Sequence, residues 1–421
     1  MQNLLSSGAR ADADVLIVGA GPAGLALACA LHDAGLAVQL VEQQSASTLA
    51  DPAEDGREIA LTHRARDVMQ TLGLWQHLDA ADVAPLRQAR VLDGGGPQVL
   101  HFGAEASAGP LGWLVPNHRI RQAAWRAVAD RPGVQVHSGV QVSGLQLPPA
   151  DAPSTLASVR LADGRVLHAP LVVAADSRFS GTRRLAGIGA AMRDFGRSVV
   201  VGRVAHTGDN EGTAWECFRY GNTLALLPMN GGQSSAVVTV PGSRAAEWLC
   251  LSDDAFAERI GHQSGGRLGA MQAVGPRHHY PLVGVYAHRF VAQRFALIGD
   301  AAVGMHPVTA HGYNFGLYGV QVLARELQRA HAARQDIGQL NVLQPYEAEH
   351  RRTTLPVYVG TNAVVSLFTD ERTPAKLARR AVLAVAERAP GLSALIKSAI
   401  TRQLTGNPAR SQALAASAVM R

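Results

Sequence analysis

A cluster of glycines near the N-terminus has the spacing that holds the phosphates of a dinucleotide. Gly19, Gly21 and Gly24 form a G-x-G-x-x-G sequence, with Ala23 inside it, directly after a short apolar run. Glycines at these positions permit a tight turn and let a pyrophosphate approach the backbone where a helix begins. Glu42, at the end of the next apolar run, is placed to hydrogen-bond a ribose hydroxyl. The pattern predicts an adenine dinucleotide, either FAD or NAD, and the alternative is a glycine-rich turn that only packs a helix on a sheet.

A second group of candidate residues lies near residue 300. Gly299 and Asp300 follow an expected buried strand over 295–298, and open α/β sheets bind ligands at the carboxyl ends of their strands. A loop containing His306 follows. A helix is expected to begin near Asn314, where free N–H groups and the helix dipole suit a ligand that becomes anionic. Taken alone, Asp300 is better explained as a helix cap and His306 as a structural histidine.

The N-terminal glycines need a strand before them and a helix after them, and the sequence provides both. Residues 14–19 are apolar and rich in β-branched side chains, as in a buried parallel strand. An Ala- and Leu-rich helix is expected to run to about Ala34 and to stop at Gly35. With a second strand over 37–42, these elements predict a Rossmann-like βαβ unit.

Other candidates lie on expected helices. Residues 55–75 predict a loop that leads into an amphipathic helix, with Arg57 before that helix, and its spacing alone favours a solvated surface arginine. Residues 117–129 predict a helix with Arg119 and Gln122 one turn apart on one face.

The middle of the chain is rich in strands. Short strands with Gly, Pro and Asp turns fill 134–174, and a buried-type strand over 171–175 ends at Asp176. Residues 190–290 are strand-like, with one helical insert near 253–260. This pattern predicts an antiparallel sheet in a second lobe.

The composition is that of a globular protein. The chain has 421 residues, 47% of them hydrophobic and 17% charged, enough to bury a sizeable interior. Its three cysteines form no C-x-x-C pair, which argues against a zinc module and a disulfide framework and favours a reducing compartment. No segment has the length and apolar character of a membrane span, and no signal peptide is expected.

Positive charge is concentrated at the C-terminus. The net charge is +6, and residues 371–421 hold nine basic and two acidic side chains, which is +7 and leaves −1 for the rest. An apolar stripe at helical spacing, flanked by Lys397 and Arg402, runs from Leu392 to Leu404. Such a helix can lie on an anionic membrane surface or pack on the protein body, and both interpretations stay open.

Three separated blocks resemble the three fingerprints of the class A flavoprotein aromatic hydroxylases. They are the glycines 19–24 with Glu42, Asp176 in VVAADSRFSGTR, and Gly299-Asp300 with His306-Pro307. Within that class the chain is most similar to the ubiquinone-biosynthesis hydroxylases, over nearly its whole length.

The sequence departs from the family pattern in three places. Ser177 replaces the usual glycine after Asp176, which puts the usual turn there in question, and Val303 replaces a histidine or methionine. The usual G-Q-G-x-N is Ala310-His311-Gly312-Tyr313-Asn314 here. His311 in place of glutamine indicates a distinct subgroup, and the pattern favours the branch that hydroxylates a demethoxyubiquinol ring.

The resemblance implies that the chain binds FAD. The residues of the first block would hold its ADP half, namely Gly19, Gly21, Ala23, Gly24 and Glu42. Arg57, Arg119 and Gln122 would contact its phosphate and ribityl region. Residues of the third block would hold the ribityl chain and the ring, namely Gly299, Asp300, Pro307, Gly312, Tyr313 and Asn314. Asp176 would serve both FAD and the approach of NAD(P)H, the expected electron donor.

The reaction that the resemblance implies is ring hydroxylation of a prenylated ubiquinone precursor with O₂, through a flavin C4a-hydroperoxide. His306, Pro307 and His311 are the catalytic candidates, and no metal is expected. The enzyme would be cytoplasmic, with its tail at the inner membrane surface or in contact with a ubiquinone-biosynthesis complex. No nucleic-acid partner is expected, because the basic residues are confined to the tail.

The predicted fold is α/β. A Rossmann-like FAD-binding domain (1–80, 104–189 and 285–370) is interleaved with an antiparallel-sheet substrate domain (81–103 and 190–284), and a basic helical tail (371–421) follows. Three alternatives remain: a flavin hydroxylase of a small soluble aromatic acid, a nicotinamide-only dehydrogenase, and a non-catalytic surface protein built on a nucleotide fold. A dehydrogenase would leave the Gly299-Asp300 block unexplained.

Overall fold

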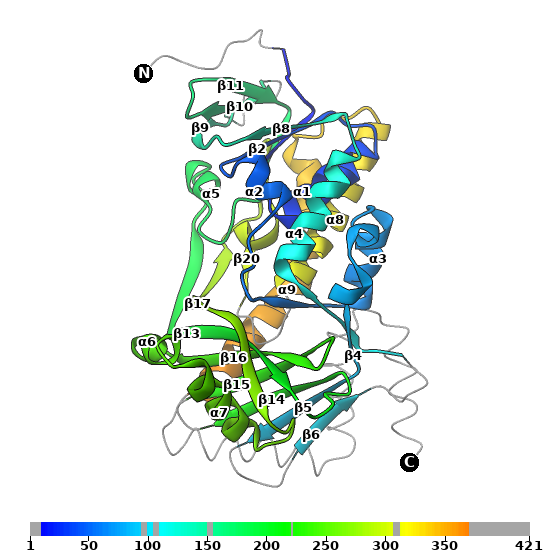
Figure 1. Cartoon of the computed structure of the whole chain (residues 1–421). Coiled ribbons are helices and arrows are strands. Elements are labelled where there is room, and N and C mark those ends of the chain that lie inside the picture. Colours follow the sequence, from blue (N-terminus) through cyan, green and yellow to red (C-terminus); the bar gives the residue numbers. More distant parts are fainter. Residues whose placement is uncertain are drawn as a thin grey trace, which may run out of the picture.

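The computed structural model describes residues 10–93, 99–103, 109–149, 155–219, 222–305 and 312–369. In Figure 1 a helix-rich part lies above a large sheet that carries two helices of its own. The chain passes repeatedly between the two parts. The C-terminal segment 371–421, on which the helical tail was predicted, lies outside the described residues.

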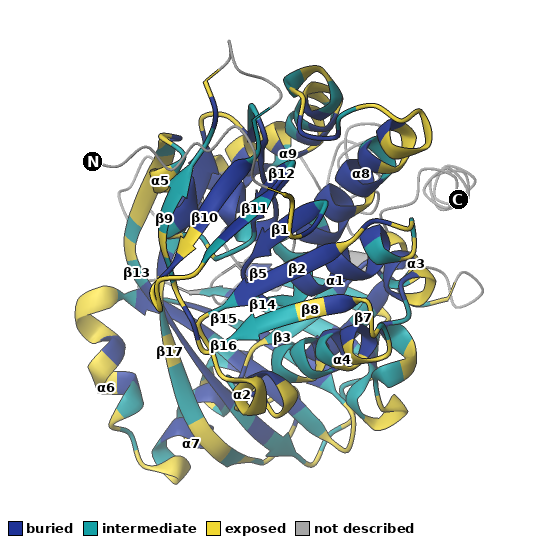
Figure 2. Ribbon diagram, turned by 90° about the horizontal axis from the view of Figure 1, so that it is seen from above, coloured by how far each residue is buried: buried dark blue, intermediate teal, exposed yellow. Residues whose placement is uncertain are grey.

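A buried, mostly parallel sheet forms the centre of the upper part. Its strands, in spatial order, are β18 (Val291–Ala292), β19 (Phe295–Leu297), β12 (Leu171–Ala174), β1 (Val15–Val18), β2 (Val38–Glu42) and β8 (Val134–Ser138). Only β18 runs antiparallel to its neighbour. β1, β2 and β12 are dark blue in Figure 2 because they are covered on both faces, as expected for parallel strands with continuous apolar sequence.

Helices pack against this sheet and complete the predicted Rossmann-like unit. α1 (Pro22–His32) follows β1 directly and ends two residues before the expected Ala34, while Gly35 takes a φ of +83° in the turn that follows. α1 contacts α4 (Asn117–Ala129) and α8 (Gly312–Ala332). The helix α4 has the bounds that the sequence predicts. Together these elements confirm the α/β fold.

The segment 55–75 differs from the prediction. Arg57 lies in a loop, as predicted, but the strand β3 (Glu58–Leu61), which was not predicted, comes between that loop and α3 (His63–Thr71). β3 pairs with β7 (Gly112–Pro116), which also pairs with β4 (Ala84–Leu86). The four residues of β3 begin with a glutamate, so neither length nor alternation identified a strand.

The lower part is an eight-stranded sheet. Its spatial order is β20 (Val303–Gly304), β17 (Met271–Ala287), β13 (Ala190–His206), β16 (Gln233–Pro241), β15 (Asn222–Met229), β14 (Thr213–Arg219), β5 (Gln88–Asp93) and β6 (Val99–Gly103). The strands within 190–290 pair antiparallel, as predicted, and β14 pairs parallel with β5, from an earlier part of the chain. That pair joins segments far apart in the chain.

The remaining elements are small. A three-stranded sheet of β9 (Val142–Gln146), β10 (Ala157–Leu161) and β11 (Val166–Ala169) lies at the top of Figure 1. Short helices are α2 (Ala46–Ala50), α5 (Gly181–Leu185) and α6 (Ala245–Leu249), and α7 (Asp253–Ser264) is longer. α6 and α7 pack on one face of the eight-stranded sheet through an apolar cluster that contains Trp248 and Phe256.

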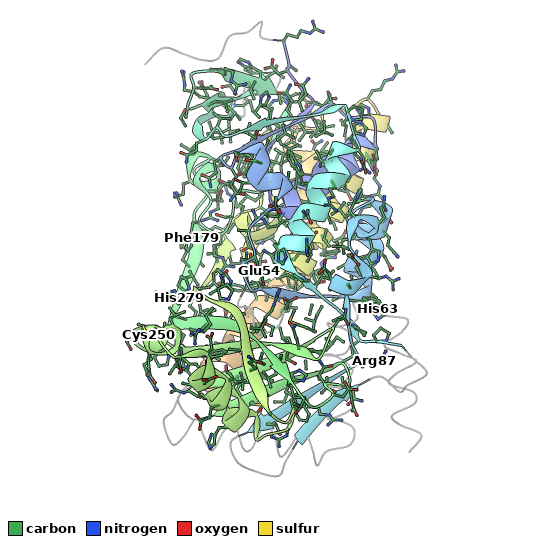
Figure 3. The ribbon with its side chains drawn as sticks, viewed as in Figure 1. Glu54, His63, Arg87, Phe179, Cys250 and His279 are labelled. Carbon is green, nitrogen blue, oxygen red and sulfur yellow. The ribbon has the colours of Figure 1, made fainter. Side chains whose placement is uncertain are left out.

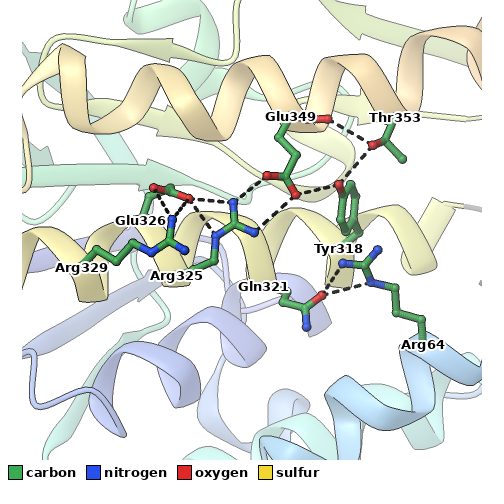
Figure 4. Close-up of polar contacts among 8 residues, drawn as sticks. All are labelled: Arg64, Tyr318, Gln321, Arg325, Glu326, Arg329, Glu349 and Thr353. Atoms are coloured by element: carbon green, nitrogen blue, oxygen red, sulfur yellow. Dashed lines mark hydrogen bonds and ion pairs between the residues drawn. The ribbon is translucent and has the colours of Figure 1, made fainter. Parts of the chain in front are cut away.

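α8 and α9 (Leu340–Thr369) are joined by a polar network (Figure 4). Arg325 of α8 pairs with Glu349 of α9 at 2.6 Å, and the Tyr318 hydroxyl donates to the same carboxylate at 2.9 Å. Arg64 of α3 donates to Gln321 at 2.7 Å. Because exposed ion pairs contribute little singly, the buried packing between these helices carries most of the stability.

Beside this network, His350 of α9 is sealed in the core. Its Nδ1 atom lies 3.1 Å from the hydroxyl of Tyr346, which donates to the carbonyl of Leu297 at the end of β19. Burial lowers the pKa of His350 to about 4, so the imidazole is neutral in the folded protein. α9 is thereby attached to the strand that precedes Gly299.

Candidate functional site

The glycine turn after β1 is shaped for an approaching ligand. Gly19 has a φ of +106°, and a Cβ built on it would lie 2.6 Å from the carbonyl oxygen of Ala175. A Cβ on Gly24 would lie 2.1 Å from the oxygen of Gly19. At Gly21, in contrast, a Cβ would meet no atom within 4 Å. Two glycines are therefore required by the fold, and the third leaves open space at the start of α1, where a pyrophosphate would fit.

Glu42 lies beside that turn. Its Oε2 atom accepts a hydrogen bond from the backbone N–H of Ala20 at 2.7 Å, and its Oε1 atom accepts one from Gln44 at 2.8 Å. These bonds fix the carboxylate at the carboxyl end of β2, next to the glycine turn. A carboxylate has further lone pairs, so it can also accept from a ribose hydroxyl.

The third block meets the first block on α1. Gly299, in a short 3₁₀ turn with a φ of +57°, lies so close to α1 that a Cβ there would be 3.1 Å from Ala23 Cβ. Gly316 of α8 approaches the same methyl group, since a Cβ built on Gly316 would lie 3.6 Å from Ala23 Cβ. Ala23, Gly299 and Gly316 thus pack together at the first turn of α1, although they come from chain segments almost 300 residues apart. Larger side chains at these positions would separate the two blocks.

Asp300 faces cationic side chains. Its Oδ2 atom accepts a hydrogen bond from Arg178 Nη2 at 3.0 Å, and its Oδ1 atom is 4.0 Å from a Cβ built on Gly312 at the start of α8. The guanidinium of Arg57 is near enough that the Asp300 charge contributes to raising its pKa, after Asp55. Asp300, Arg57 and the start of α8 therefore share one region.

Arg57 is held by a small polar group at the junction of the two parts. Although burial opposes its charge, the ion pair with Asp55 at 2.6 Å raises the pKa of Arg57. Its guanidinium also lies over the ring of Tyr280, whose hydroxyl donates to the Asp55 carbonyl at 2.6 Å. Asn117 donates to the Asp55 carboxylate at 2.7 Å. Arg57 is thus a surface arginine, 45% exposed as its spacing favoured, whose side chain is held in place by these partners.

A second ion-pair group lies at the same junction. Arg203 of β13 reaches up to Glu54 at 2.6 Å and to Glu58 at 3.0 Å. The Glu58 side chain is only 1% exposed, and burial raises its pKa to about 7 against the opposing effect of Arg203. Figure 3 labels Glu54 at this boundary and His279 on the sheet below it. The junction is therefore held by charged as well as apolar contacts.

The start of α8 is fixed by the side chain of Asn314. Its Oδ1 atom accepts from the backbone N–H of Thr62 at 3.0 Å, and its Nδ2 atom donates to the carbonyl of Ala60 at 2.8 Å. The Tyr313 hydroxyl is buried without a hydrogen-bond partner among the described residues, and burial raises its pKa. These two side chains serve the packing of α8, while its first backbone N–H groups are the part that suits an anion.

Arg119 and Gln122 lie together on α4, as their spacing predicts. Arg119 donates to Gln122 at 3.2 Å and pairs with Asp82 at 3.0 Å. Gln122 donates to the carbonyl of Ala50 in α2 at 3.3 Å. Arg119 is exposed and Gln122 half-buried, both have protein partners in this structure, and their contact with a cofactor stays a prediction.

Asp176 caps a helix in this structure. Its carboxylate accepts hydrogen bonds from Ser180 and from both the backbone and the hydroxyl of Thr182 at the start of α5. Ser177 keeps the turn that a glycine would form, with a φ of +97°. The turn that its identity put in question is therefore present, at the cost of a left-handed backbone for a residue with a side chain.

The sequence analysis missed two arginines of the middle block. Arg178 pairs with Asp300, and Arg183, 2% exposed, donates to the carbonyl of Ala301 at 2.9 Å. Both lie in VVAADSRFSGTR, but nothing in their spacing indicates a partner more than 100 residues away. His306, Pro307 and His311, in contrast, lie outside the described residues, so their predicted roles stay predictions.

Taken together, the site joins a glycine turn for a pyrophosphate, a carboxylate for a ribose, and a helix start for an anionic ring edge. These features fit an elongated dinucleotide that runs from Glu42 past Ala23 to Asp300 and Gly312. Since the second end is built for a group that takes up negative charge, the arrangement suits a flavin better than a nicotinamide alone. Among the described residues, no group of His, Cys, Asp and Glu could hold a metal ion.

Comparison with known proteins agrees with this geometry. A family model described as an FAD binding domain matches residues 12–355. The ubiquinone hydroxylase UbiM of Neisseria meningitidis is 44% identical, over 93% of this chain and 84% of its own. UbiL of Rhodospirillum rubrum, also a ubiquinone hydroxylase, is 36% identical over 89% of this chain and 86% of its own. The 3-demethoxyubiquinol 3-hydroxylase of Escherichia coli is 27% identical over 89% of this chain and 95% of its own.

Among solved structures, PqsL of Pseudomonas aeruginosa, a probable FAD-dependent monooxygenase, has a TM-score of 0.71 and 22% identity. It covers 85% of this chain, and this chain covers 97% of it. That likeness supports the fold.

Proposed function

We propose that this chain, which belongs to the family of FAD-dependent ubiquinone hydroxylases, hydroxylates the aromatic ring of a prenylated ubiquinone precursor. As a member of that family it is an FAD-dependent oxidoreductase, with O₂ as co-substrate and NAD(P)H as the family's usual electron donor. The observation that carries the proposal is the contact of Ala23 with Gly299. It brings the two sequence blocks that would hold opposite ends of FAD to one turn of α1.

Bound FAD supplies the chemistry, since no protein side chain can activate O₂ for transfer to a ring. The protein's first task is to bind the cofactor. In our proposal the backbone at Gly21 receives the pyrophosphate, Glu42 the ribose, and Asp300 the ribityl chain. Arg57, whose guanidinium is close enough to Asp300 for the two charges to interact, would add a positive charge for the phosphates.

The second task is to stabilise negative charge on the flavin ring during turnover. The first N–H groups of α8 would do this, because a helix start carries partial positive charge and unpaired donors. Each preorganised donor of this kind lowers a transition state by about 3 kcal/mol. Asn314 holds the start of α8 to β3 through two hydrogen bonds, which supports a fixed position for these donors.

The third task is to hold the substrate and exclude water. The division into an FAD-binding domain (1–80, 104–189, 285–370) and a substrate domain (81–103, 190–284) is part of this proposal. It is supported by the eight-stranded sheet, which lies below the cofactor site and is joined to it by Arg203 and Tyr280. The apolar residues between them would exclude water from the ring.

We further propose that the basic tail, 371–421, brings the enzyme to an anionic membrane surface on the cytoplasmic side or into a biosynthetic complex. Among the described residues no helix is both long and apolar enough to cross a bilayer. A prenylated precursor resides in lipid, so a basic amphipathic helix would let it enter without crossing water. Pelleting of the full chain and of a chain lacking 371–421 with anionic and neutral vesicles tests this, and equal pelleting would contradict it.

The experiment for the proposed function combines genetics and enzymology. Deletion of the gene in its host should cause one prenylated quinone precursor to accumulate, and the identity of that precursor gives the ring position. The demethoxyubiquinol branch requires that the precursor lack one ring hydroxyl. The purified yellow protein should oxidise NAD(P)H faster when that precursor is added. Acceleration by a small soluble aromatic acid instead, with no change in the quinone pool, would overturn the proposal.

A further inference from the structure

The two faces of the eight-stranded sheet differ in what covers them. One face packs under α6 and α7 around Trp248. Alternate residues of the same strands point to the opposite face, where Ala214 and Leu227 pack with Ala60 of β3. Because the carbonyl of Ala60 is bonded to Asn314, this second face is turned toward the start of α8, where the flavin ring is expected.

A row of directly paired residues crosses this second face. Glu216 of β14 pairs with Ala225, which pairs with Val237 of β16. Val237 pairs with Val201 of β13, which pairs with His278 of β17. Residues directly opposite each other share a face, so three apolar side chains lie between a carboxyl group and an imidazole. At about 4.8 Å per strand, the row is about 19 Å from end to end.

Glu216, at one end of this row, is a carboxyl group in an otherwise apolar setting. It is half-buried, and no described residue hydrogen-bonds or ion-pairs with it. Burial alone raises its pKa to about 7. A half-buried carboxyl group with no partner among the described residues is costly to fold, which points to a partner that arrives from outside.

The charged groups around this face do not reach Glu216. Arg203, on the same face but at β13, is held by Glu54 and Glu58. Arg90 of β5 is paired with Trp215 and lies over its ring, so it belongs to the other face. His278 is at the far end of the row. Glu216 is therefore the acidic group that an aromatic ring lying on Ala225, Val237 and Val201 would meet.

We propose that Glu216 binds the ring hydroxyl of the phenolic substrate and takes its proton during hydroxylation. This inference rests on the proposed function. The O–H bond of the substrate breaks, its proton moves to a carboxylate oxygen of Glu216, and the electron pair stays on the ring oxygen. The ring becomes more electron-rich and so a better nucleophile toward an electrophilic oxygen. When the product leaves, Glu216 returns the proton to the product oxygen or to water.

Two variants of Glu216 separate binding from proton transfer. Glu216→Gln keeps a hydrogen-bonding side chain but cannot take a proton, so we expect KM to change less than threefold and kcat to fall about 100-fold. Glu216→Leu removes the hydrogen bond as well, so we expect weaker binding by about tenfold. Wild-type kcat should rise with pH through the range near 7 as the carboxyl ionises, and this rise should be absent from Glu216→Gln.

The matched control is Glu258→Gln, an exposed glutamate of α7 on the other side of the same sheet. Flavin content and thermal unfolding of all three variants show whether a change is merely structural. If both Glu216 variants have the same kcat, KM and pH profile as the wild type, the role of Glu216 is overturned, while the proposed function stays intact.

If the wild-type enzyme hydroxylates no prenylated phenol, the proposed function fails separately. A titration with a prenylated phenol, followed by the change in flavin absorbance, then still measures its affinity for the wild type and for Glu216→Leu. Equal affinity in that titration, or no binding to either protein, overturns the Glu216 assignment.

Discussion

Asp300 accepts a hydrogen bond from Arg178 at 3.0 Å, and the same arginine donates to the carbonyl of Val283 in β17 at 3.1 Å. One side chain of the middle sequence block thus contacts the third block and the eight-stranded sheet. The position of Asp300 therefore depends on both parts of the molecule.

Replacement of Asp300 should release the cofactor. In Asp300→Ala, Arg178 loses its carboxylate partner and the ribityl chain loses its expected acceptor, so we expect purified protein with less than a tenth of the wild-type flavin. Asp300→Asn keeps an acceptor oxygen and should retain more flavin than the alanine variant. Flavin is measured from visible absorbance after gel filtration, and full flavin content in Asp300→Ala would contradict the assignment.

The glycine turn allows a test that separates folding from binding. Gly21→Val should fold normally, because a Cβ at Gly21 meets no protein atom, but it should block FAD through contact with the pyrophosphate. Gly24→Ala is the matched control for the fold, since its Cβ would lie 2.1 Å from a backbone oxygen, and we expect a loss of about 3 kcal/mol in unfolding free energy. Urea unfolding shows whether each variant folds, and flavin content shows whether it binds FAD. Normal flavin occupancy in Gly21→Val would refute the pyrophosphate site.

Ser177→Gly should make the protein more stable. Ser177 has a φ of +97°, a conformation that costs a residue with a side chain about 1–2 kcal/mol and glycine almost nothing. Part of this gain is offset by the greater freedom of glycine in the unfolded chain. We therefore expect the free energy of unfolding, measured with urea, to rise by about 0.5–1 kcal/mol. Ser177→Ala keeps the Cβ and should show no gain. If the alanine and glycine variants are equally stable, the strained turn is not the cause.

His350 should make stability depend on pH. Burial lowers its pKa to about 4 in the folded protein, whereas the pKa of histidine in an unfolded chain is about 6.5. Below pH 6.5 the unfolded state therefore binds more protons than the folded state, and stability falls as the pH drops toward 4, by up to about 3 kcal/mol. Above pH 6.5 this contribution is constant.

The measurement compares urea unfolding of wild type and His350→Gln at pH 7.5 and pH 5. The loss of stability between these two values should be smaller in the variant. His262→Gln changes an exposed histidine of α7 and should leave the wild-type difference unchanged. A pH dependence in His350→Gln equal to that of wild type would count against a neutral, buried imidazole.

The N-terminal half of the candidate site was predictable because its signals are local. The strand, the glycines 19–24 and Glu42 lie within 30 residues, and Gly19 and Gly24 are required by the local backbone, where a Cβ would clash. Asp300 was placed at the end of a strand for the same reason. The cofactor contacts of these residues remain predictions, but their positions relative to β1, β2 and β19 follow from sequence.

The rest of the site depends on contacts between distant segments. The spacing of Arg57 favoured a surface arginine, and the side chain is 45% exposed, but its contact with the ring of Tyr280 in β17, more than 200 residues away, could not be predicted from sequence. The bonds of Asn314 to Ala60 and Thr62 join segments about 250 residues apart. Glu216 was not singled out at all, because one glutamate in an apolar strand is notable only when the register of its neighbours is known.

The two-residue strand β20 has a mechanical consequence. Val303 and Gly304 hydrogen-bond to Tyr286 and Val285 of β17, so the chain leaves the substrate sheet only eight residues before α8 begins. A tilt of that sheet, whether caused by a bulky ligand or by a distant substitution, would therefore move β20 and the 3₁₀ turn of Gly299–Ala301 that directly precedes it, which contains Asp300. We therefore expect inhibitors that never touch the flavin to change its reduction potential.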